Sequence, residues 1–145
     1  MNESVRYIKS LCVDEIIVKK LQELSFSPTG TRRFCLHDSP EAPLHTMVIE
    51  VEAGVEYPPH QHLDSDEIIF ILSGKMDILI WDKGSAESPS VIHLDSSLNI
   101  SPIVLVSESM IHLTKPITQC IYMEFKLGPF KKENLKMIEK DKLLF

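Results

Sequence analysis

The chain has 145 residues, of which 43% are hydrophobic and 25% charged, with a formal net charge of −6. This length suits one domain whose core needs no disulfide support. The basic residues are scattered, which argues against a nucleic-acid-binding surface, and no apolar run approaches the roughly 18–20 residues of a membrane span. Three widely spaced cysteines and an N-terminus without an apolar secretory segment predict a cytoplasmic protein with reduced thiols.

The first element expected along the chain is a short helix over residues 14–24. Its apolar residues recur every three or four positions, and Asp14 can cap its start. The segment 25–31 contains both Pro and Gly and ends the helix. Residues 1–30 are therefore expected to form an N-terminal helix and a connector.

Short apolar or alternating segments fill the middle of the chain and predict β-strands, because turns and not helices separate them. These segments are residues 46–52, 67–72, 76–81, 91–94, 103–106 and 119–125. A tight turn at 73–75 contains a glycine, which suits a hairpin. Strands at this spacing are typical of an antiparallel sandwich or barrel.

The C-terminal residues 131–145 are expected to close the domain as a helix, since Leu135 and Ile138 lie at helical spacing. We therefore predict one domain in three parts. A β-barrel over residues 31–130 follows the N-terminal part and precedes this helix.

Two histidines in the middle of the chain suggest a metal site. His60 and His62 are separated by one residue and share a face if the backbone is extended. The preceding Pro58-Pro59 pair favours extended backbone. Glu67 follows a short polar bend and begins the next apolar segment, so it can face the histidines. Two imidazoles and a carboxylate on one wall suit a divalent transition metal.

The spacing around these residues resembles a known motif. Gly54 is followed by five residues, the triplet 60–62, four residues, Glu67, six residues and Gly74. This resembles the first motif of the cupin superfamily, G(X)5HXH(X)3,4E(X)6G, at every fixed position. The resemblance implies a mainly β fold, a cupin-type antiparallel jelly-roll β-barrel with short N-terminal and C-terminal helices. It also implies one divalent transition metal ion (Fe, Mn, Ni, Co or Zn) on His60, His62, Glu67 and one later histidine.

Two histidines compete for the fourth metal position. The second cupin motif, G(X)5PXG(X)2H(X)3N, can be aligned on His112, but only the histidine matches. The positions where Gly, Pro, Gly and Asn are usual hold Ser101, Ser107, Ser109 and Pro116. His93, in the segment 91–94, is the alternative. We favour His112, because the last ligand of a cupin lies on a late strand that faces the first motif.

Within the cupins, the chain is similar to the WbuC-like cupin-fold metalloproteins. It shares a helix before the barrel, an Arg-rich segment that leads to His37 (residues 31–37), and an E-x-K-x-G-P-aromatic pattern within residues 123–130. Phe130 stands where that family often has Tyr. The resemblance implies a link to bacterial surface polysaccharide (O-antigen) metabolism and, by analogy, a homodimer.

Three further residues are candidates for contacting a substrate or orienting a metal ligand: Arg33, His37 and Glu124. Arg32 and Arg33 could bind an anionic group through forked hydrogen bonds, or could simply be solvated. His37 and His45 have the pKa range of acid–base groups. Glu124 could orient a ligand histidine or pair with a lysine.

A centre with three histidines and one carboxylate leaves an octahedral ion two positions for water, dioxygen or a chelating substrate. We therefore expect a metal-dependent isomerase-like or dioxygenase-like enzyme that acts on a sugar or small oxygenated acid, its catalytic residues unassigned. One alternative is a non-catalytic module that binds metal or a sugar-derived small molecule. Another is a metal-independent sugar epimerase, which is disfavoured because such sites replace the metal-binding histidines.

Overall fold

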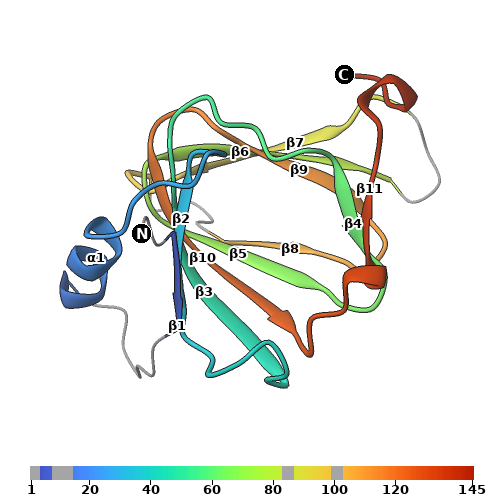
Figure 1. Cartoon of the computed structure of the whole chain (residues 1–145). Helices are drawn as coiled ribbons and strands as arrows, with labels where there is room; N and C mark the ends of the chain where they lie inside the picture. The colour runs from blue at the N-terminus through green and yellow to red at the C-terminus, as the bar shows by residue number, and fades with distance from the viewer. Residues whose placement is uncertain (1–3, 8–14, 83–86, 99–102) are drawn as a thin grey trace.

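Two β-sheets face each other in the computed structural model, which describes residues 4–7, 15–82, 87–98 and 103–145 (Figure 1). The six-stranded sheet has the order β1 (Val5–Tyr7), β2 (Thr31–Cys35), β3 (Leu44–Val51), β10 (Cys120–Leu127), β5 (Glu67–Ser73) and β8 (Ile103–Val106). The five-stranded sheet has the order β11 (Leu135–Met137), β4 (His60–His62), β9 (Ile111–Pro116), β6 (Lys75–Trp81) and β7 (Ser90–Asp95). All paired strands are antiparallel except β1 and β2. The arrangement confirms the predicted mainly β jelly-roll fold.

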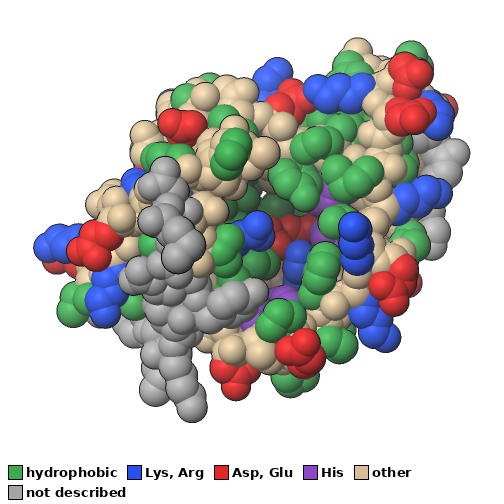
Figure 2. All heavy atoms as spheres, viewed as in Figure 1, with side chains coloured by type: hydrophobic (Ala, Val, Ile, Leu, Met, Phe, Trp, Pro, Cys, Tyr) green, Lys and Arg blue, Asp and Glu red, His purple; other side chains and the backbone are tan. Residues whose placement is uncertain are grey.

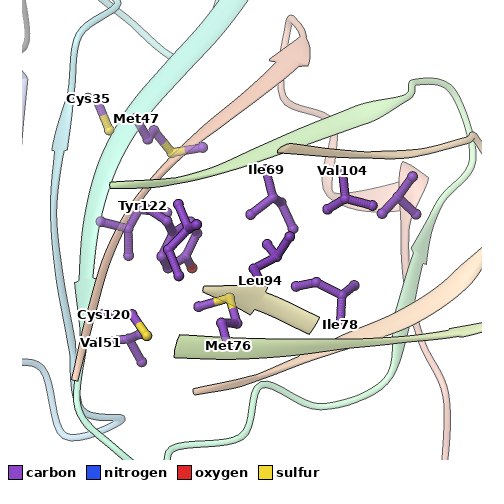
Figure 3. Close-up of a cluster of buried hydrophobic side chains, with 13 residues drawn as sticks. Cys35, Met47, Val51, Ile69, Met76, Ile78, Leu94, Val104, Cys120 and Tyr122 are labelled. Carbon is purple, nitrogen blue, oxygen red and sulfur yellow. The ribbon is translucent and has the colours of Figure 1, made fainter. Parts of the chain in front are cut away.

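The space between the sheets holds the largest apolar cluster, because side chains alternate along each strand. On β5, Ile69 and Ile71 are buried between the sheets, whereas Ile68 and Phe70 are half-buried. Figure 3 shows side chains from both sheets meeting in this cluster, among them Met47, Tyr122, Met76, Ile78 and Leu94.

Helix α1 (Glu15–Gln22) packs beside the six-stranded sheet and confirms the predicted N-terminal helix (Figure 1). Ile17 and Leu21 are buried on one side of the helix, as their spacing predicts. They contact a patch of the sheet made by Phe34, Val48 and Ile121. Asp14, the expected cap, lies outside the described residues.

The prediction of one continuous closing helix over 131–144 is wrong. A 3-10 turn at Lys132–Asn134 and another at Lys140–Lys142 flank strand β11, which pairs with β4. The physical reason is that β4 would otherwise leave one edge of backbone N–H and C=O groups without partners. Helical spacing of two apolar residues is too weak to compete with those hydrogen bonds. Strand β11 therefore supports the strand that carries His60 and His62.

Two turns show how backbone conformation and sequence agree or conflict. Gly74, in the predicted turn between β5 and β6, has φ +90°, and a Cβ there would collide with the carbonyl oxygen of Gln119. Ser109, between β8 and β9, has φ 63° although it is not glycine.

In the described part of the chain, no helix is long and apolar enough to cross a membrane.

Candidate metal centre

Three strands bring the four predicted metal-binding residues together. β4 carries His60 and His62, β5 begins with Glu67, and β9 carries His112 directly opposite His60 in the strand register. One donor atom from each residue lies within 4.8 Å of the donor atoms of the others. All four side chains are buried, which is unusual for histidine and glutamate.

Backbone carbonyls orient two of the imidazoles. Nδ1 of His60 lies 2.9 Å from the carbonyl oxygen of Pro58, and Nδ1 of His112 lies 3.1 Å from that of Met110. Because a carbonyl oxygen only accepts, each Nδ1 carries the proton and donates it. The Nε2 atom of each ring is then the one available to a metal, an arrangement common among ligand histidines.

Glu67 lies between two histidines. Nε2 of His112 donates a hydrogen bond to Oε2 of Glu67 over 3.0 Å. Nε2 of His62 lies 2.8 Å from the same oxygen, but the contact lacks hydrogen-bond geometry, so this buried nitrogen has no hydrogen-bond partner within the described part of the chain. An unsatisfied buried nitrogen lowers the stability of the folded protein unless a bound group supplies the missing partner.

Burial and these contacts shift the pKa values in different directions. Burial, with the charge of His112, lowers the pKa of His60 to about 3. Burial also lowers the pKa of His112, but the hydrogen bond and charge of Glu67 outweigh it and leave the value raised. Burial raises the pKa of Glu67, yet the contacts with His112 and His62 hold it well below its usual range. Without a metal, the cluster therefore keeps an ionised carboxylate beside a protonated imidazole.

The four donors fit a divalent transition metal. Mixed imidazole and carboxylate donors suit such ions, and the observed limit of 4.8 Å between donor atoms is close to the roughly 4 Å that separates donors on opposite sides of an ion about 2 Å from each. A cation would satisfy the unpartnered nitrogen of His62 and would take the place of the proton shared by His112 and Glu67. The cluster and the fold together indicate a metal ion, whose identity they leave open.

His93 is not part of this cluster. It lies on β7, its side chain is 76% exposed, and its Nδ1 is 2.7 Å from Oδ1 of Asp77 on β6. Of the two histidines considered for the fourth position, the structure brings His112 to the other three donors.

A cavity of about 220 Å³ lies against the donor cluster. Figure 2 shows the hollow, where acidic, basic and histidine side chains lie together inside a rim of hydrophobic ones. Besides the four donors, its lining comprises Thr31, Arg33, Ile49, Tyr57, Thr114, Tyr122, Glu124, Lys126, Phe130 and Leu135. The centre is therefore accessible to a small molecule.

Strand β10 contributes a largely buried ion pair to this cavity. Nζ of Lys126 lies 3.1 Å from Oε1 of Glu124, and Lys126 pairs in the strand register with Glu67. Burial raises the pKa of Glu124, and the charge of Glu67 adds to the shift. Sequence reasoning identified Glu124 but missed Lys126. The alternation of Tyr122, Glu124 and Lys126 along one strand face was the signal that could have found it.

The two neighbouring arginines of β2 have different surroundings. Arg33 lines the cavity. Arg32 points away from it, and its Nε donates a hydrogen bond to Glu50 over 2.7 Å. Its Nη1 donates to the carbonyl oxygens of Gln22 and Leu24 at the end of α1, each over 2.7 Å. Arg32 therefore ties the helix to the sheet.

The structure does not bring His37 or His45 into the cavity. Their rings stack with centroids 4.0 Å apart. Nε2 of His45 donates to the carbonyl oxygen of Pro40 over 2.9 Å, and Nδ1 of His37 lies 3.1 Å from the amide nitrogen of Thr46. These contacts suit a structural role at the end of the barrel.

Comparisons with known proteins identify a family for this chain but not a function. A family model described as "Domain of unknown function (DUF6016)" matches residues 15–92. No curated protein matches the sequence.

Solved structures share the fold at low sequence identity. The capsular polysaccharide assembling protein CapF from Staphylococcus aureus aligns with a TM-score of 0.64 and 14% identity, over 79% of this chain and 31% of CapF. KdgF from Halomonas sp. aligns with a TM-score of 0.57 and 14% identity, over 75% of this chain and 88% of KdgF. A cupin superfamily protein from Desulfitobacterium hafniense aligns with a TM-score of 0.55 and 14% identity, over 72% and 83% of the two chains. This chain spans about a third of CapF, and such identities establish a common fold alone.

Proposed function

Because the chain belongs to the family described as a domain of unknown function (DUF6016) and has the cupin fold, we propose that it is a small metal-binding cupin. Its centre would hold one divalent transition metal ion (Fe, Mn, Ni, Co or Zn) on His60, His62, Glu67 and His112. The observation that carries the proposal is that four buried donors converge and that one of them, Nε2 of His62, has no hydrogen-bond partner among the described residues.

We propose further that the centre acts on a small oxygenated molecule as a metal-dependent isomerase-like or dioxygenase-like enzyme. The bound ion would supply Lewis-acid or oxygen-activating chemistry. The cavity beside the donors leaves room for a ligand, and Glu124 offers a buried carboxyl with a raised pKa that can hold and release a proton there.

Elemental analysis tests the metal proposal. Protein purified without chelator is expected to contain about one transition metal ion per chain, whereas His112→Ala should lose at least tenfold in metal content because one donor is gone. His93→Ala is the matched control, since His93 is exposed and is not one of the four clustered donors, and this variant should retain the metal. An empty wild-type protein, or loss of metal from the His93→Ala variant alone, would overturn the proposed centre.

A binding module without turnover is the second candidate, since the same donors and cavity could simply hold a ligand. Incubating the metal-loaded protein with small sugars and oxygenated acids separates the two. Consumption of a compound by the wild type but not by His112→Ala supports an enzyme. Ligand-induced thermal stabilisation without product supports a binding module. The metal-independent epimerase gains no support from a cavity in which all four donors are present.

We propose membership of the WbuC-like cupins and a link to surface-polysaccharide metabolism. The similarity of fold to CapF, a capsular polysaccharide assembling protein, is compatible with that setting. The cytoplasm remains the proposed compartment, since the three cysteines are widely spaced along the sequence and form no C-x-x-C motif; Cys35 and Cys120 are buried, and Cys12 lies outside the described residues. Co-purification of a polysaccharide precursor, or altered surface polysaccharide in a deletion strain, would test the link.

The partner that we propose is a second copy of this chain. Ile103 and Leu105 on the edge strand β8 are 52% and 57% exposed, and Leu105 pairs in the sheet with half-buried Ile68. An exposed apolar edge of this kind is normally covered. Light scattering should give twice the chain mass of 16.5 kDa, and Leu105→Lys should shift the protein towards the monomer. A monomeric wild type would overturn the proposal.

A further inference from the structure

Arg33 stands out because it is an exposed residue at the cavity whose side chain has no counter-ion among the residues that the structure describes. It lines the same cavity as the metal-binding residues. The only polar contact of its side chain with the described residues is a weak one, in which Nη1 lies 4.0 Å from Sδ of Met47. No carboxylate lies within ion-pairing distance of Arg33 among the residues that the structure describes. A guanidinium in such a position is available to a ligand.

The other charges of the cavity are only partly balanced. Lys126 is paired with Glu124 over 3.1 Å. Glu67 offsets one of the two positive charges that a divalent ion would bring, since ligand histidines are neutral. The loaded cavity would therefore carry a net positive charge, to which Arg33 contributes. A site with two uncompensated positive charges favours an anion over a neutral molecule.

The size of the cavity limits the anion. Its volume of about 220 Å³ is below the 300–1,000 Å³ of typical drug-sized pockets. It corresponds to roughly seven water-sized groups at about 30 Å³ each. A small acid fits these limits, whereas a nucleotide-linked sugar would have to remain largely outside.

Guanidinium chemistry further specifies the group that binds. The planar fork of Arg33 matches the two oxygens of a carboxylate and holds them by paired, charge-assisted hydrogen bonds. A molecule that also carries a hydroxyl or carbonyl next to its carboxylate has a second oxygen for the metal. Because Arg33 and the donors line one small cavity, one such molecule can contact both.

We propose that the ligand of this centre is a small 2-hydroxy or 2-oxo carboxylic acid whose carboxylate is bound by Arg33. This inference rests on the proposed metal centre and narrows its ligand from sugars and acids in general to small acids. Arg33 is then the residue that makes the site select an acid over a neutral molecule of the same shape.

The test compares acids with their neutral amides on metal-loaded protein. Glycolate, lactate and pyruvate, with glycolamide, lactamide and pyruvamide, are titrated calorimetrically into the wild type and into Arg33→Gln. At least one acid should bind the wild type at least tenfold more tightly than its amide. Arg33→Gln should weaken that acid about 10- to 100-fold, the effect of losing charge-assisted hydrogen bonds, and leave the amide nearly unchanged.

Two further variants make the interpretation specific. Arg33→Lys retains the charge but not the fork, so its affinity for the acid should fall between those of the wild type and Arg33→Gln. Lys115→Gln removes an exposed positive charge from β9 and should have no effect, because Lys115 is not part of the cavity lining. Thermal unfolding of each variant verifies that the fold is intact.

The metal content of the same samples separates the two ways to fail. If the wild type contains metal but no acid is preferred over its amide, or if Arg33→Gln binds the acid as tightly as the wild type, only the role of Arg33 is overturned. If the wild type contains no metal, the proposed centre fails and this inference fails with it.

Discussion

The two ends of the space between the sheets differ in chemistry although the same strands line both. On β5, Ile69 and Ile71 point into the apolar cluster, and Glu67, two residues before Ile69 on the same face, points into the metal centre. On β10, Tyr122 lies in the apolar cluster and Glu124 lines the cavity. The candidate site is therefore a continuation of the core face of the barrel, built on rigid strands.

This difference indicates that the two ends are stabilised by different means. Burial of aliphatic side chains stabilises the apolar end by about 1.5–3 kcal/mol for each fully buried residue. Burial of charged and polar groups at the other end costs free energy unless they are paired. A bound cation would offset that cost. The stability of the apolar end should therefore not change with metal, whereas the stability of the polar end should depend on it.

The largest expected effect is that of metal removal. Dialysis against a chelator should lower the free energy of unfolding by about 4 kcal/mol relative to protein in free metal at about 1,000 times its Kd, because only the folded state binds the ion. For a chain of this size, that corresponds to roughly 10 °C in Tm. Scanning calorimetry with and without metal measures the shift. The His112→Ala variant is the control and should show no metal-dependent shift.

A substitution at the apolar end should act independently of the metal. Ile69→Ala removes a side chain that is 1% exposed and should destabilise the fold by about 2–5 kcal/mol through lost burial and the cavity left behind. Urea unfolding followed by circular dichroism measures the change, and elemental analysis should find the metal retained. Loss of metal from the folded Ile69→Ala protein would contradict the separation of the two ends.

Acid should weaken the polar end before the apolar end. The raised pKa of His112 means that this imidazole of the metal-free site holds its proton to a higher pH than free histidine does, and metal must displace that proton. Metal affinity should therefore fall as pH drops, with occupancy declining clearly below about pH 6. His60, with a pKa of about 3, should not contribute to the decline over this range.

Metal retention measured between pH 8 and pH 4.5 checks this expectation, with circular dichroism to verify that the protein is still folded. Full occupancy at pH 4.5 would contradict a centre that contains three histidines.

The smallest expected effect concerns the loop that leads to His112. Ser109 has φ 63°, a left-handed conformation that costs a non-glycine residue roughly 1–2 kcal/mol, partly offset by the greater unfolded-state entropy of glycine. Ser109→Gly should therefore stabilise the fold by about 0.5–1 kcal/mol, measured as a higher urea midpoint. Ser109→Ala should not stabilise it, and equal stabilisation by both variants would contradict a conformational cause.

Ser109 also shows that a motif position can lack its usual glycine and still have the backbone conformation that favours glycine. The second cupin motif has glycine at this position, and the chain does not, yet the backbone takes the conformation that favours glycine. The amide of Ser109 donates to the carbonyl oxygen of His62 over 2.6 Å, a contact that helps to hold this loop against the metal-binding strand. The absence of glycine in the sequence therefore hid a backbone conformation that the structure nevertheless adopts at Ser109.

The sequence by itself determined the features that depend on local spacing. The alternation of apolar residues predicted most strands of the barrel, and the spacing from Gly54 to Gly74 predicted that His60, His62 and Glu67 act together. These features follow from local backbone geometry, because strand parity decides which neighbouring side chains share a face.

Only the tertiary structure decided the features that depend on which distant strands pair. It placed His112 opposite His60 and left His93 on the surface. It directed Arg33 to the cavity and Arg32 to helix α1. It also made part of the C-terminal segment a strand beside β4. Spacing along the chain carries no information on cross-strand register. That register follows from packing and from the need of each strand edge for hydrogen-bond partners.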